Sequence, residues 1–275
     1  MRAVAGRFDG FVLSFDLEDW HQLVRRGAGA QDWDVPHPAF ERQVRVVLDF
    51  LDRIDVKATF FVLGMCARNY PALVSELAER GHEIASHGTA HARVYAQTRD
   101  EFRADLEESI AQLEELTGRR PTGYRAPAFS INRDTLWAYD VLAELGFRYD
   151  SSQHDSPRIP RRIEGIPGDA YRLRLDSGGE LWEFPITVGR IGGRTVPIGG
   201  GGYWRVFPRL AAAALAPRRQ AGERLPGPLL PSVRVRPQTP PGGPASHGRA
   251  EPTPEGGITE PVPEPRPAQD DRATG

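Results

Sequence analysis

The chain has 275 residues, of which 39% are hydrophobic and 9% aromatic, enough to build one sizeable hydrophobic core. Its 35 Lys and Arg residues nearly balance its 37 Asp and Glu residues, so no broad basic field favours binding to nucleic acid. The single cysteine, Cys66, excludes an intrachain disulfide framework, and no apolar run reaches the roughly 18 residues of a membrane span. Residues 1–9 hold no apolar stretch typical of a secretory signal, so the sequence indicates a cytoplasmic protein.

The composition changes along the chain. All aromatic residues lie at or before Phe207, whereas residues 208–275 contain none and are rich in Pro, Gly, Arg and Ala. Such a segment cannot build a core. We therefore expect one folded domain over residues 10–207 and a tail over 208–275 that is either disordered or the product of a shifted reading frame.

Short apolar runs alternate with amphipathic segments from residue 10 to about residue 149. This order is typical of parallel strands joined by helices, and it predicts an α/β fold, an open or closed barrel with its chemistry at the carboxyl ends of the strands. We expect strands at residues 11–15, 58–63, 83–86 and 147–149, helices over 40–51, 71–80, 98–117 and 132–145, and glycine-rich hairpins over 170–204.

Several helix boundaries have their own signals. Pro71 stands where the first turn of a helix tolerates proline, and Gly81 can end that helix. Thr98 and Glu101 have the spacing of a capping box. Asn132 is the residue type that caps the start of a helix, which places the beginning of the last predicted helix there.

Two histidines follow the predicted strand 83–86. His87 and His91 are four residues apart, and on a helical turn this spacing points both rings to one side with Cβ atoms about 5–6 Å apart, as two metal ligands require. The alternative interpretation is a pair of solvent-facing histidines in a loop.

Three acidic residues lie at the end of the first predicted strand. Asp16, Glu18 and Asp19 come where a barrel strand would open into a site, and carboxylates that leave a buried strand are costly without partners. Metal binding or acid–base chemistry would use them. A solvated turn or a helix cap is the alternative.

An arginine begins the segment Arg125-Ala126-Pro127-Ala128-Phe129, which comes just after another predicted strand. A guanidinium there can hold a carboxylate in a fixed bidentate orientation, and the proline can fix the backbone so that a following amide faces an oxyanion. The alternative is a surface arginine in a turn. All three motifs together are far less expected by chance than any one of them.

The order Phe15-Asp16, His87-x-x-x-His91 and Arg125-x-Pro127-x-Phe129 resembles the polysaccharide deacetylases of the NodB-homology type, carbohydrate esterase family four. The resemblance covers about residues 11–204 and includes the linking segments 59–64 and 81–87. It implies a distorted (β/α) barrel, a divalent metal ion, commonly zinc, and removal of N-acetyl groups from an amino-sugar polysaccharide or its precursor. The expected partner is thus an N-acetylated oligo- or polysaccharide.

The resemblance also implies roles for single residues. Asp16 takes the general-base position, with Arg125 orienting it. His87, His91 and one acid would hold the metal; the D-x-E spacing favours Glu18 over Asp19 without excluding the latter. A backbone amide near Ala128 or Phe129 would face the oxyanion.

The first motif departs from the family's adjacent Asp-Asp pair. This version resembles the branch associated with exopolysaccharide and exosortase loci, and also the branch of peptidoglycan deacetylase-like and allantoinase-like enzymes. An amidohydrolase of small cyclic amides is therefore the alternative enzyme.

The family's late histidine, the proton donor of a Leu-His or His-Pro-Trp type motif, is not found. After His154 the only histidine is His247, set among prolines. The barrel is therefore expected to lack its last elements, and His154 is the candidate for a substitute donor or a substrate contact. A catalytically impaired product that binds metal or glycan is the alternative outside the enzyme class. The sequence does not indicate an oligomeric state.

Overall fold

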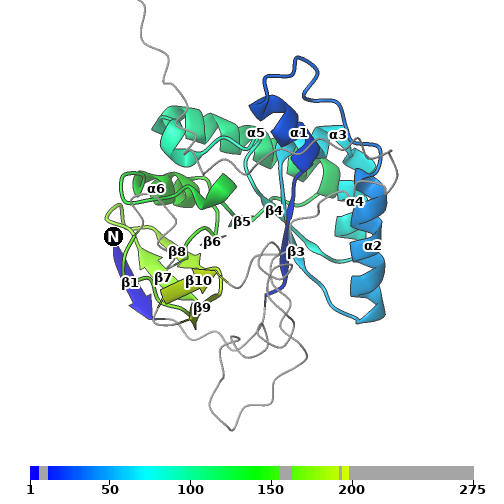
Figure 1. The fold of residues 1–275 in the computed structure, drawn as a ribbon. Helices are drawn as coiled ribbons and strands as arrows, with labels where there is room; N and C mark the ends of the chain where they lie inside the picture. The colour runs from blue at the N-terminus through cyan, green and yellow to red at the C-terminus, as the bar shows by residue number, and fades with distance from the viewer. Residues whose placement is uncertain (6–11, 155–162, 192–193, 198–275) are drawn as a thin grey trace, which may run out of the picture. The chain divides into compact units, whose positions relative to one another are not determined.

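The computed structural model describes residues 1–5, 12–154, 163–191 and 194–197, and these form an arrangement of helices and one large sheet (Figure 1). The predicted tail, residues 208–275, and the glycine run 199–202 lie outside the described residues. The helices are α1 (Trp20–Gly27), α2 (Phe40–Arg53), α3 (Gly64–Asn69), α4 (Pro71–Glu79), α5 (Arg99–Thr117) and α6 (Trp137–Glu144), with 3₁₀ turns η1 (Val94–Ala96) and η2 (Pro127–Phe129). The strands are β1 (Arg2–Ala5), β2 (Ser14–Leu17), β3 (Thr59–Val62), β4 (Glu83–Ser86), β5 (Gly123–Tyr124), β6 (Tyr149–Asp150), β7 (Tyr171–Arg174), β8 (Glu180–Glu183), β9 (Val188–Ile191) and β10 (Arg194–Pro197).

The large sheet has the strand order β1-β7-β8-β6-β5-β4-β3-β2. The pairs from β2 to β6, and β6 with β8, are parallel, whereas β7 pairs antiparallel with both β8 and β1. The predicted α/β class is therefore confirmed. Among the described strands the sheet has two ends, at β1 and β2, and β9 and β10 form a separate hairpin.

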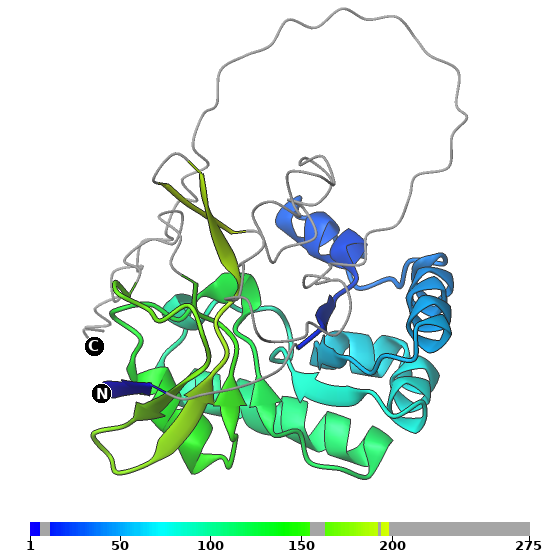
Figure 2. The same cartoon turned by 90° about the horizontal axis from the view of Figure 1, so that it is seen from below.

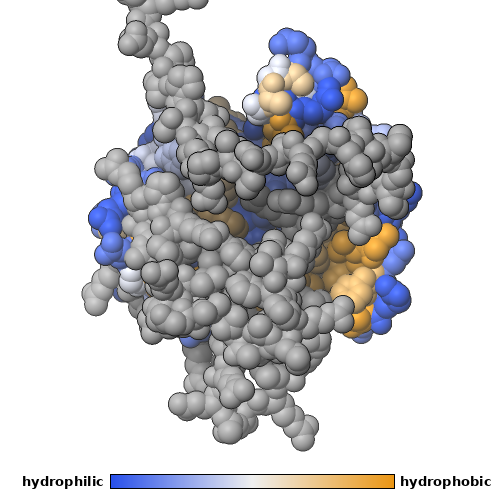
Figure 3. All heavy atoms as spheres, in the orientation of Figure 1, coloured by the Kyte–Doolittle hydropathy of each residue, from blue (hydrophilic) through white to orange (hydrophobic). Residues whose placement is uncertain are grey.

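Helices α2, α4 and α5 lie along the outer side of the parallel strands (Figure 2). The inner face of α2 buries apolar side chains three or four positions apart, the spacing of one helix face: Phe40, Val44, Leu48 and Leu51. The outer side of the same helix exposes Val46 and Phe50 beside polar residues, and hydrophobic surface is visible over this region (Figure 3). None of the helices in the described ranges is both long and apolar enough to cross a bilayer.

Most of the predicted boundaries agree with the structure. Helix α4 has Pro71 at its first position, and Gly81 after it adopts φ of 82°. The capping box of α5 is formed, because the Glu101 amide donates to Thr98 Oγ1 and the Thr98 amide donates to Glu101 Oε2. The hairpins expected over 170–204 correspond to β7–β8 and β9–β10 in the described residues.

Other boundaries differ from the prediction. Helix α6 starts at Trp137 and not at Asn132, because the Asn132 side chain accepts the Asp134 amide at 2.9 Å and so caps a turn before the helix. Strand β2 continues through Asp16 to Leu17, with all four residues buried, so Asp16 lies inside the strand rather than after it. Helices α1 and α3 and strand β1 were not predicted; the first two are short, at eight and six residues.

Candidate active site

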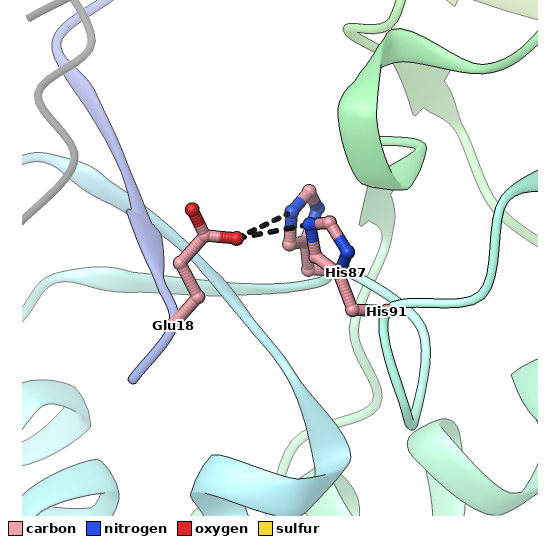
Figure 4. A group of neighbouring side chains, drawn as sticks. All are labelled: Glu18, His87 and His91. Atoms are coloured by element: carbon pink, nitrogen blue, oxygen red, sulfur yellow. Dashed lines mark ion pairs between the residues drawn. The ribbon is translucent and has the colours of Figure 1, made fainter. Parts of the chain in front are cut away.

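Three side chains from two separate segments of the chain meet at the carboxyl ends of β2 and β4. Glu18 follows β2, and His87 and His91 follow β4 (Figure 4). The Glu18 Oε2 atom lies 3.1 Å from His91 Nε2 and 3.8 Å from His87 Nε2. One ligand atom from each residue lies within 4.8 Å of the other two. The structure thus brings Glu18 together with both predicted histidines.

The orientation of His87 is fixed by its second ring nitrogen. Nδ1 lies 2.7 Å from the main-chain oxygen of Arg125, so it carries the proton and donates it to that carbonyl. Nε2 then presents its lone pair toward Glu18, and within the described residues this buried atom has no hydrogen-bond partner. Such a carbonyl behind a histidine is the usual arrangement for a metal ligand.

Two imidazoles and one carboxylate converge here, with Glu18 and His87 buried and His91 partly buried, and this set fits a divalent metal ion. The donor set matches zinc and several other first-row metals, and three protein ligands leave coordination positions for water and substrate. The orphaned, buried Nε2 of His87 is the observation that a metal would explain.

The histidine pair does not lie on a helical turn, contrary to the prediction. Residues 87–91 form a loop in which Gly88 has φ of 77° and His91 has φ of 57°. The ring centroids are nevertheless 5.5 Å apart, and His87 is buried. The left-handed residues, rather than helical spacing, turn both rings to the same side.

Asp19 lies outside this group. Its carboxylate caps α1 by accepting the His21 amide at 3.1 Å, and it also accepts the His37 amide at 3.0 Å and the Tyr70 hydroxyl at 2.7 Å. The helix-cap interpretation therefore holds for Asp19. Between the two acids left open by the sequence, the structure places only Glu18 beside the histidines.

A buried ion pair lies next to the group. Arg125 Nη1 donates to Asp16 Oδ1 at 2.7 Å, and both side chains are almost fully buried. Asp16 and Glu18 are two positions apart in the same extended segment, so their side chains point to the same face. The Arg125 guanidinium also lies 4.0 Å from the centre of the Phe61 ring. The predicted pairing of Asp16 with Arg125 is present.

Serine residues hold the rest of this guanidinium, and the sequence prediction missed them. Arg125 Nε donates to the Ser151 carbonyl at 3.0 Å, and Nη2 donates to Ser151 Oγ at 2.8 Å and to Ser14 Oγ at 3.0 Å. Ser151 Oγ in turn donates to the Phe184 carbonyl at 2.8 Å. A signal was available for Ser151, which lies two positions after the predicted strand 147–149. A buried ion pair is stable only when such bonds satisfy its remaining donors.

A pair of buried acids lies behind these serines. Asp150 and Glu183 are register partners on β6 and β8, and their side chains are hydrogen-bonded to each other. Burial raises the pKa of Glu183 well above its usual value and also raises the pKa of Asp150, so the pair shares a proton. Asp150 Oδ1 accepts the Ser152 hydroxyl at 2.6 Å, and Ser152 Oγ accepts the Ala126 amide at 2.8 Å.

The assignment of the Phe129 amide to the oxyanion is not supported. Its N–H donates to the Ala126 carbonyl at 2.9 Å, because Ala128 and Phe129 adopt φ of 53° and 54° and fold the segment back on itself. The Phe129 ring instead packs edge-on against the ring of His154, with centroids 5.3 Å apart. His154 is buried, and no role follows for it from these contacts alone.

Two family models match the chain. Residues 34–149 match a family described as polysaccharide deacetylase, a range that contains His87, His91 and Arg125 but not Asp16 or Glu18. Residues 155–226 match a domain of unknown function. This second match crosses residue 208, where the composition predicts the start of the tail.

The chain is similar to several known proteins. It is 34% identical over 144 residues to a peptidoglycan deacetylase-like protein of Gibberella zeae. This match covers 52% of this chain and 37% of that protein. It is 27% identical over 181 residues to a peptidoglycan deacetylase of Helicobacter pylori, covering 66% and 57%. The solved structure of a polysaccharide deacetylase from Mycobacterium smegmatis, itself of unproven activity, has a TM-score of 0.54 and 32% identity, covering 68% of this chain and 63% of that one. In all three cases the matched part is less than two thirds of the relative.

Proposed function

Since the chain carries a polysaccharide deacetylase domain, we propose that it is a metal-dependent hydrolase that removes N-acetyl groups from an amino-sugar polymer. The observation that carries this proposal is the convergence of Glu18, His87 and His91 beside the buried Asp16–Arg125 pair. The relatives are named for peptidoglycan, so an N-acetylated glycan of this kind is the proposed substrate. Zinc as the metal, a cytoplasmic location and an origin in exopolysaccharide loci are parts of the proposal that rest on the sequence.

In this proposal each residue has one task. Glu18, His87 and His91 hold a divalent metal ion, which when bound supplies a Lewis acid for the amide carbonyl and makes water easier to deprotonate. Asp16 accepts the proton of the attacking water through a carboxylate oxygen. Arg125 orients that carboxylate through its 2.7 Å hydrogen bond.

The departing amine needs a proton, and His154 is the proposed donor. The His154 side chain is buried, and its ring packs against the ring of Phe129. Phe129 lies four positions after Arg125, and its ring is also near the Arg125 guanidinium. The family's late histidine has no counterpart in the described residues. Slow turnover is expected if His154 does not fill the role.

Acetate release tests the proposal directly. The chain with one equivalent of Zn²⁺ should release acetate from N-acetylglucosamine oligomers or from peptidoglycan, and the His87→Ala, His91→Ala double variant should not, because it loses the metal. Allantoin serves as the matched cyclic amide. Hydrolysis of allantoin alone would favour the amidohydrolase, and metal binding without any turnover would favour an impaired product.

A further inference from the structure

The loop that carries both histidines is in a conformation that needs support. Gly88 and His91 are left-handed, with φ of 77° and 57°. For a residue other than glycine, such as His91, this backbone is strained and persists only where neighbours hold it. Neighbouring segments must therefore fix residues 87–91.

One side of the loop is fixed by the start of α3. The Gly64 amide donates to the Gly88 carbonyl and the Met65 amide donates to the Thr89 carbonyl, both at 2.9 Å. The approach is close, since a Cβ added to Gly64 would lie 3.1 Å from Thr89 Cα. These bonds use the carbonyl oxygens of the loop and leave its N–H groups to be satisfied elsewhere.

The other side is fixed by one acid of α5. Both carboxylate oxygens of Asp105 accept the Thr89 amide, at 3.1 and 3.2 Å, and the Ala90 amide donates to the same carboxylate. The Thr89 hydroxyl donates to the Asp105 carbonyl at 2.7 Å. Gly88 leaves room for this carboxylate, because a Cβ there would lie 2.7 Å from Asp105 Oδ2.

We propose that Asp105 is a positioning residue for the metal site: its carboxylate holds the 87–91 loop so that His91 reaches the position opposite Glu18. This inference rests on the proposed function, since it takes the three side chains as metal ligands. A carboxylate suits the task because it only accepts hydrogen bonds, and two N–H groups converge on it. An Asn has one acceptor oxygen and would turn an NH₂ group toward an N–H donor.

The test compares metal affinities of the full chain. Dissociation constants for Zn²⁺ and Co²⁺ are measured for the parent and for Asp105→Asn, with Glu108→Gln as the matched control one turn along α5, where the side chain pairs with Arg68 at the surface. Asp105→Asn should weaken binding by about 10- to 100-fold, the usual effect of losing a group that orients a ligand. Glu108→Gln should bind as the parent does.

Two further readouts separate positioning from stability alone. The visible absorption of the Co²⁺ complex at saturating cobalt should change in Asp105→Asn, because the His91 geometry is altered, whereas a purely stabilising residue would leave the spectrum of the folded protein unchanged. Asp105→Glu keeps an acceptor-only group and should retain more affinity than Asn. It also keeps the test open if the Asn variant does not fold.

The possible failures are distinguishable. Parent-like affinity and an unchanged cobalt spectrum in Asp105→Asn would overturn the role of Asp105 while leaving the metal site intact. Equal losses in the Asn and Glu variants would also overturn it, because the carboxylate would then not matter. If the parent binds neither metal, or if His91→Ala binds as the parent does, the proposed metal site itself is wrong.

Discussion

Replacement of Asp16 by Asn probes the buried ion pair and the proposed base with one atom exchange. The Asn side chain has the shape of Asp and keeps an oxygen where Arg125 Nη1 now donates at 2.7 Å. It carries no charge and cannot accept the proton of water. The other bonds of Arg125, to Ser14 and Ser151, are untouched.

The expected sizes follow from these contacts. A hydrogen bond to a charged group contributes about 1.5–3 kcal/mol and a neutral one about 0.5–1.5 kcal/mol, so Asp16→Asn should destabilise the fold by about 1 kcal/mol. Asp16→Ala removes the acceptor as well and leaves a buried cation with no counter-charge from residue 16, which should destabilise by about 3–5 kcal/mol. Turnover in Asp16→Asn should fall by about 10²-fold or more, the scale for losing a positioned base.

The assay combines acetate release, metal content and urea unfolding on the same preparations. Asp16→Asn should keep its metal, unfold at nearly the parent's urea concentration and lose turnover, whereas Asp16→Ala should lose stability markedly. Parent-like acetate release by Asp16→Asn would refute the base assignment. Loss of metal as complete as in the His87→Ala, His91→Ala double variant would show that Asp16 belongs to the metal ligands instead.

Two other substitutions test the groups behind Arg125. Ser151→Ala removes one acceptor of the guanidinium but keeps the main-chain one, so kcat should fall by about tenfold with KM nearly unchanged; a change in KM alone would contradict this. The pKa of Glu183 is raised in the folded protein, so this residue contributes to stability below the pKa that it has in the unfolded chain. Between that pKa and the raised one, the contribution falls by about 1.4 kcal/mol per pH unit as the pH rises. Glu183→Gln mimics the protonated form. Thermal unfolding between pH 5 and pH 9 should show that the stability of this variant increases relative to that of the parent as the pH rises. Parallel curves of stability against pH would exclude the shared proton with Asp150.

The parts of the site that the sequence predicts are those with a local pattern. Asp16, His87 and Arg125 each follow or end an apolar run, and strands of a parallel sheet bring their carboxyl ends to one edge. Glu18 was favoured over Asp19 by spacing only. The structure separates them, because Asp19 is occupied as the cap of α1 while Glu18 faces the histidines.

The parts that the sequence does not predict depend on contacts between distant segments. Asp105 lies in the middle of an amphipathic helix, and only the docking of α5 against the 87–91 loop gives it a role. The left-handed φ of His91 has no residue-type signal, since glycine is the usual marker of that conformation. The shared proton of Asp150 and Glu183 likewise requires β6 and β8 to be neighbours, although 33 positions separate the two residues in the chain.

The last prediction concerns the DNA that encodes residues 228–232. The second family match continues to residue 226, so a shifted reading frame, if it explains the tail, is expected after that position and not near residue 208. The protein sequence there is Pro-Leu-Leu-Pro-Ser followed by Val233. With codons CCN, CTN and TCN, reading one nucleotide later gives codons of the form CNC, TNC, TNC, CNT and CNG.

Those codons permit Leu-Tyr-Phe-His-Pro, which has the histidine and proline of the motif that the resemblance implies for the proton donor. We therefore expect the genomic sequence to read His-Pro in the shifted frame at this point, and restoration of that frame to raise the rate of acetate release. A shifted frame with no histidine codon there would contradict this explanation. The present tail would then be the native one, and His154→Ala would become the decisive variant, because His154 is the remaining proposed donor of the proton to the departing amine.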